Sequence, residues 1–170
     1  MGIFSAIKEL LSGSPDPEPT PELQAEARAN WERAARSGDY AEAFNAAHYL
    51  GQEAWLWDEC VAALRSLYQR FEAHRGETAA MIGQSLYLGK AGYRAELSEA
   101  EQAAVYQDAL AWYAQAAQHG DRSQSLNFVE MCEWLAERPS YRAALRPFLN
   151  NYRSLYPNDE YQARIDALSV

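Results

Sequence analysis

From residue 21 onward, the order of hydrophobic and polar positions is typical of helices that bury one face. One example runs from Trp57 to Phe71, where apolar residues recur at intervals of four, three, four and three residues. This is the period of an α-helix. No stretch of the sequence shows the sustained alternation that a half-buried strand requires. The pattern predicts a single all-α domain over residues 22–170, with about seven or eight helices and no sheet.

Glycine and proline residues indicate where the predicted helices begin and end. Pro21 suits the first position of a helix. Gly38 predicts the end of that helix, and Asp39 predicts the cap of the next one. Gly76 and Gly120 follow later helical stretches in the same way, so we expect each of them to end a helix.

The second half of the chain carries further helix signals. Ser98 and Glu101 have the spacing of a capping box, so a helix is expected to begin there. Pro139 is expected to open a later helix, and Pro147 to kink or break it. Asn158 is expected to cap a last helix.

The N-terminal segment differs from the rest in composition. Residues 1–11 predict a short amphipathic helix, and four of the ten residues from 12 to 21 are proline, which predicts a linker. The apolar side of the helix must be covered by the body of the protein, by a partner's groove or by a membrane surface. The sequence leaves these three alternatives open.

An internal repeat is visible when the three glycines are aligned, since they are 38 and 44 residues apart. Each unit is a helix pair that cannot bury its apolar stripe alone, and stacking neighbouring units would bury it. The unit over residues 82–121 has a fixed series of small and aromatic residues, namely Ile82, Gly83, Gly89, Gly92, Ala109, Trp112, Tyr113, Ala116, Ala117 and Gly120.

This series resembles the Sel-like repeat, a relative of the tetratricopeptide repeat. The resemblance covers about residues 22–156 and is strongest over residues 77–121. It implies a right-handed superhelical solenoid of antiparallel helix pairs that binds proteins on a concave surface lined by the first helix of each pair. Asn45 and Asn127 replace the small residue of the pattern in the flanking units, which implies local rearrangement.

The composition narrows the possible partners without indicating a reaction. The net charge of −9 and the pI of about 4.8 argue against nucleic acid, because phosphate binding needs a basic face. No apolar run approaches the roughly 20 residues that span a bilayer, and the first residues lack the basic start of a secretory signal. We therefore expect a cytoplasmic protein with no membrane contact except through residues 2–11.

Candidate chemistry is sparse. Cys60 and Cys132 form no CxxC pair and are expected to be small buried residues. His48, His74 and His119 fall in different units, without the spacing of zinc ligands. No phosphate-binding loop or nucleophile motif occurs. We therefore expect no catalytic residue, no metal site and no cofactor.

The expected partner is another protein, and a basic one. Trp55 and Trp57 lie on opposite sides of a helix start, so one of them is expected to point outward as an aromatic contact. The other candidates follow from the concave surface that the resemblance implies. The complete set of candidate contacts is Glu42, Asn45, His48, Trp55, Trp57, Ser85, Asn127 and Glu130.

A separate block of charge lies near the C-terminus. Residues 138–156 hold four arginines and no acidic residue, and Arg138, Arg142 and Arg146 are four apart. They predict ion pairs with the glutamates at 130, 133 and 137 of the preceding helix, or an arginine stripe for an anionic partner.

Four functions remain open at this stage. The leading hypothesis is a non-catalytic protein-interaction module, whose acidic surface steers basic partners. A narrower version is a bacterial immunity protein that neutralises a basic toxin. The others are an enzyme built on helical repeats and an adaptor held at a membrane by residues 2–11.

Overall fold

A computed structural model describes residues 18–92 and 97–168, and this part of the chain is all-α without any strand. The all-α class without a sheet that the sequence predicts is confirmed for these residues. The predicted helix over residues 1–11, and the linker up to residue 17, lie outside them. The eight α-helices are α2 (Pro21–Ser37), α3 (Tyr40–Gln52), α4 (Trp57–Arg70), α5 (Arg75–Gln84), α6 (Glu99–Gln118), α7 (Ser125–Ala136), α8 (Arg142–Leu155) and α9 (Gln162–Asp166).

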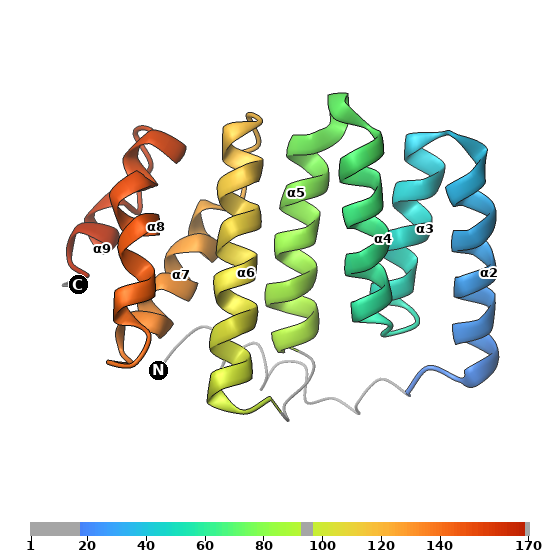
Figure 1. Cartoon of the computed structure of the whole chain (residues 1–170), viewed down its shortest axis with the longest axis horizontal. Helices are drawn as coiled ribbons and strands as arrows, with labels where there is room; N and C mark the ends of the chain where they lie inside the picture. The colour runs from blue at the N-terminus through green and yellow to red at the C-terminus, as the bar shows by residue number, and fades with distance from the viewer. Residues whose placement is uncertain (1–17, 93–96, 169–170) are drawn as a thin grey trace.

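The helices follow one another along the long axis of the molecule in chain order, from α2 at one end to α8 and α9 at the other (Figure 1). Each helix packs against the next one in the chain, and α8 also packs against α6. We call α3, α5, α7 and α9 the A helices, and α2, α4, α6 and α8 the B helices. No helix among the described residues is both long and apolar enough to cross a membrane.

A recurring turn joins three of the B helices to the A helix that follows. Gly38, Gly120 and Asn158 stand at these turns with φ of 77°, 94° and 61°. Glycine adopts this left-handed conformation without strain, and asparagine tolerates it better than most residues. Asn158 follows Gly120 by 38 residues, the spacing that separates Gly38 from Gly76. The turn therefore recurs beyond residue 156, where the sequence resemblance was expected to end.

An aspartate follows each of these left-handed residues and caps the backbone beyond it. Asp39, Asp121 and Asp159 each accept a hydrogen bond through Oδ1 from a backbone N–H two or three residues later. The donors are Glu42, Ser123 and Tyr161, at 2.9, 3.0 and 2.9 Å. The three turns thus share both their backbone conformation and their side-chain cap.

Gly76, the remaining one of the three aligned glycines, behaves differently from the prediction. Helix α4 already ends at Arg70, and Gly76 lies inside the first turn of α5 instead of ending a helix. A Cβ atom at this position would lie 3.1 Å from the backbone oxygen of His119. The glycine therefore allows the start of α5 to approach the end of α6 closely.

Two predictions about the C-terminal helices are also wrong, and a third is wrong in part. Pro139 lies in the turn after α7, and α8 begins only at Arg142. Of the two effects expected from Pro147, a kink or a break, the break does not occur, because α8 continues through Pro147 to Leu155. Asn158 is the left-handed residue of a turn and does not cap α9.

The core depends on aromatic rings that lie directly on glycines. The ring of Trp57 fills the space where Gly51 and Gly89 would otherwise carry a Cβ, and the ring of Tyr113 does the same at Gly83. Both aromatic side chains are buried. The absence of a side chain at these glycines lets the rings lie directly against the helix backbone.

Helix α5 continues without interruption into a π-helix, η2 (Ser85–Ala91). The helical backbone continues to Gly92, where the first described segment ends. Gly89 faces Trp57 from within η2, while Tyr87 of η2 is buried and reaches towards α7.

The cap of the last turn predicts a change of stability with pH. Burial opposes the ionisation of Asp159, but hydrogen bonds from Ser125, Tyr161 and Tyr152 outweigh it and lower its pKa below the ordinary 3.8. This stabilisation is present above pH 3.8 and is lost as the pH falls through the lowered value. Asp159→Asn should cost about 1–3 kcal/mol at pH 7, and the difference from wild type should shrink below pH 4.

Urea unfolding from pH 2.5 to 7 measures this difference. Glu32→Gln, an exposed change on α2, is the matched control and should follow wild type throughout. A cost of Asp159→Asn that stays constant down to pH 2.5 would show that the charge of the cap contributes nothing.

Candidate functional site

The outward side chains of three A helices form one candidate binding surface. They recur every three or four residues, and each is exposed or half-buried. Helix α3 contacts η2, and η2 is joined to α7 by a hydrogen bond from Tyr87 to Glu130. We define this A-helix surface by Glu42, Asn45 and His48 of α3, Met81 and Gln84 of α5, Leu88 of η2, and Asn127 and Glu130 of α7.

Five of the eight residues predicted from the sequence belong to this surface. Glu42 and Asn45 are exposed, whereas His48, Asn127 and Glu130 are half-buried. Asn127 donates hydrogen bonds to the hydroxyl of Tyr113 at 3.3 Å and to a side-chain oxygen of α7's N-cap residue at 2.7 Å. Asn127 thus occupies the position that a small residue has in the repeat pattern. There it makes a polar contact with α6, the adjacent B helix.

The prediction needs correction at two of the remaining residues. Ser85 and Trp57 are only 3% and 2% exposed, so neither lies at a surface. Ser85 packs beside the Cys60 thiol, and Trp57 packs on glycines. Trp55 is the half-exposed member of the tryptophan pair. Its φ of 53° is unusual for a bulky residue, at a helix end where glycine is the common choice.

Glu130 is the most distinctive group on the A-helix surface. The hydroxyl of Tyr87 donates to its carboxylate at 2.9 Å, and burial, followed by the contact with Glu130, strongly raises the pKa of Tyr87. The pair therefore consists of a neutral phenol and a half-buried carboxylate. Within the described residues, no ion pair involves Glu130.

An aromatic cluster borders Glu130. The ring of Tyr106 packs edge-on against Tyr87 and against Trp134, with centroid distances of 5.4 and 5.0 Å. The guanidinium of Arg138 covers the ring of Trp134 at 3.5 Å. Sequence reasoning missed this cluster, although Trp134 lies one helical turn after Glu130 and could have been found from that spacing.

The predicted ion pairs between α7 and α8 do not form as expected. Glu133 pairs with Arg164 of α9 through both carboxylate oxygens, at 2.8 and 2.6 Å. Arg138 forms an ion pair with its sequence neighbour Glu137 at 3.6 Å and another with Glu99 of α6 at 3.4 Å. Arg138 and Arg142 also donate to backbone oxygens at the end of α7, at 2.7 and 2.6 Å. The reason is that the last carbonyls of a helix lack partners within the helix and attract cationic donors.

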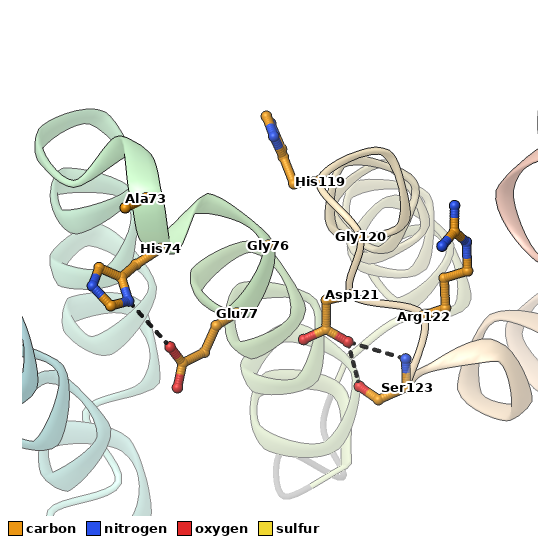
Figure 2. A pocket seen from close by; sticks show the side chains of 9 residues that line it. All are labelled: Ala73, His74, Gly76, Glu77, His119, Gly120, Asp121, Arg122 and Ser123. Carbon is orange, nitrogen blue, oxygen red and sulfur yellow. Dashed lines mark hydrogen bonds and ion pairs between the residues drawn. The ribbon is translucent and has the colours of Figure 1, made fainter.

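A second location is an open cleft of about 560 Å³ between the start of α5 and the turn from α6 to α7. Figure 2 shows that its side chains do not converge, since His119 and Arg122 point away from Asp121. The polar contacts are local: His74 lies 3.6 Å from Glu77, and Asp121 accepts from the following serine. Ser123 is the one hydroxyl side chain in this lining, and its contact with Asp121 belongs to the capped turn.

Metal and thiol chemistry find no support in the described residues. No group of three or more His, Cys, Asp or Glu side chains in residues 18–92 and 97–168 is arranged to hold a metal ion. Cys60 and Cys132 are free and buried, as expected. Burial raises the pKa of both thiols, which disfavours the reactive thiolate.

Comparisons with protein-family models, with curated proteins and with solved structures find no match to this chain. The chemistry and geometry of its own residues therefore carry the functional argument.

The link between η2 and α7 can be measured directly. Tyr87→Phe should lower the free energy of unfolding by about 1–3 kcal/mol, because a half-buried carboxylate loses its hydroxyl donor. Glu130→Gln should reduce that cost, since a neutral amide accepts a weaker hydrogen bond. A double-mutant cycle should give a coupling of about 0.5–3 kcal/mol.

Tyr49→Phe, on α3, is the control for the tyrosine change and should show no coupling with Glu130→Gln. Additive effects of Tyr87→Phe and Glu130→Gln would mean that the hydrogen bond does not join the two helices energetically.

Proposed function

We propose that this chain is a non-catalytic helical-repeat module of the Sel-like kind, a right-handed superhelical solenoid that binds a basic protein on its A-helix surface. The recurring turn with its aspartate cap supports the repeat, because three turns share one backbone conformation and one side-chain contact. Neighbouring A helices in such a stack present their outward side chains on a common surface.

The observation that carries the proposal is the environment of Glu130. Its carboxylate is half-buried and accepts a hydrogen bond from a neutral phenol. Among the described residues no cation lies within ion-pair distance of it; Arg164, which pairs with Glu133, acts on it only from farther away. A carboxylate removed from water is stabilised by a cationic partner at hydrogen-bond distance. A lysine or arginine of a bound protein would supply that cation, next to the aromatic rings of Tyr106 and Trp134.

The overall charge supports the same choice of partner. A net charge of −9 favours encounter with a basic protein and discriminates against acidic ones. Neutralisation of a basic toxin by a bacterial immunity protein is a narrower form of this proposal. It requires the same acidic surface and differs only in the activity of the partner.

Affinity capture from the cells that produce the protein tests the proposal, with wild type compared with two charge reversals. Glu130→Lys should abolish capture of the partner, because it places a cation opposite the partner's own. Glu32→Lys on α2 is the matched control and should retain it. The captured protein should be basic, and its association with wild type should slow as salt rises.

If Glu130→Lys captures the partner as well as wild type does, the proposed site is wrong. If the captured partner is acidic, the proposed chemistry is wrong. For the neutralising version, the captured protein should stop growth when expressed alone and should be harmless when co-expressed with this chain.

A further inference from the structure

A groove of about 300 Å³ lies between the last two helices, away from the A-helix surface. Its lining combines apolar and charged groups from both helices. Ile165 is buried in its floor, and Leu149 and Leu168 are half-buried. The complete lining is Arg146, Leu149 and Asn150 of α8 with Ile165, Asp166 and Leu168 of α9.

The groove has a defined place in the succession of helices. Helix α8 packs across α6 and α7, which are the preceding B and A helices. Helix α9 follows the Asn158 turn and so holds the next A position. Helix α8 thus covers the surface between α6 and α7. The groove between α8 and α9 is the corresponding surface, one unit later in the chain. No helix of residues 18–92 or 97–168 occupies it.

The charges around the groove indicate the chemistry of its occupant. Asp166 is already paired, with Arg153 at 2.8 Å and with Gln162 at 2.7 Å. Arg146 is exposed, and among the described residues it has no ion pair. The other arginines of the stretch 138–156 are engaged elsewhere, Arg138 and Arg142 at the end of α7 and Arg153 with Asp166. Among the described residues, the rim of the groove therefore presents one cation without an ion pair, Arg146, beside apolar side chains.

We propose that this groove binds an amphipathic helix of a partner protein, with an apolar stripe over Leu149, Ile165 and Leu168 and a carboxylate towards Arg146. Helix-in-groove recognition uses apolar anchors at i, i+3 or i+4 and i+7, which fits the way B helices pack on their neighbours. This site is independent of the A-helix surface and selects the opposite charge.

A second copy of this chain is a poorer occupant. The helix it could offer by position is α2, the first B helix. The outward side of α2 carries exposed polar residues, among them Glu22, Glu26, Arg33 and Arg36. Such a helix offers carboxylates for Arg146 but no stripe of large apolar residues for the floor of the groove, so α2 of a second copy is a poor occupant.

Selection from a phage-displayed library of helical peptides tests the proposal, with full-length wild type and Arg146→Glu as parallel targets. Wild type should enrich peptides with apolar residues at helical spacing and with Asp or Glu beside them. The leading peptide, as a synthetic fluorescent probe, should bind Arg146→Glu about tenfold more weakly or worse. A lysine-for-glutamate version of the peptide should regain affinity for Arg146→Glu.

Two further variants make the outcome decisive. Leu149→Glu should abolish binding, whereas Arg33→Glu on α2 should leave it unchanged, and circular dichroism should show that both remain helical. No enrichment over the Leu149→Glu target, or peptides without acidic residues, would overturn the proposal. Self-association of wild type that Arg146→Glu abolishes would also overturn it, because the occupant would then be a second copy.

Discussion

Close contact between aromatic rings and glycine backbones is the constraint on which the rest of the structure depends. The ring of Trp57 lies against Gly51 of α3 and Gly89 of η2, so that one side chain sets the distance between three helices. Tyr113 against Gly83 plays the same part between α6 and α5. A methyl group at any of these glycines would occupy space that the ring already fills, and interiors packed to this density have no room to absorb it.

This packing also positions the candidate site. Because Gly89 is held against Trp57, η2 lies beside α3, and its Tyr87 reaches Glu130 on α7. Helices α3 and α7 are thereby linked through η2, although they are far apart in the sequence. In the proposed function, the partner binds the A-helix surface. The buried aromatic residues contribute indirectly, by setting the distances between the helices that carry this surface. The groove between α8 and α9 follows from the same succession of helices.

The sequence predicted the helical class, the cap at Asp39 and the capping box at Ser98, because these features depend on residues close together in the chain. It placed Gly76 wrongly, because the need for a glycine there comes from the close backbone of His119, a residue 43 positions away. The 38-residue interval from Gly120 to Asn158 is present in the sequence. The repeat was not recognised there because asparagine replaces glycine at position 158. The partners of Glu130 and Glu133 could not be read at all, because Tyr87 and Arg164 reach them only in the folded chain.

A double-mutant cycle between Gly89 and Trp57 tests the central constraint most directly, through the free energy of unfolding in urea. Gly89→Ala alone should destabilise the protein by about 1–3 kcal/mol, because the new methyl group collides with the indole ring. In a Trp57→Leu background the same change should cost much less, since the smaller side chain leaves room. Gly92→Ala, where the nearest atom to a Cβ is 3.6 Å away, should be tolerated in both backgrounds. An equal cost of Gly89→Ala with and without the indole, or no cost at all, would contradict the account.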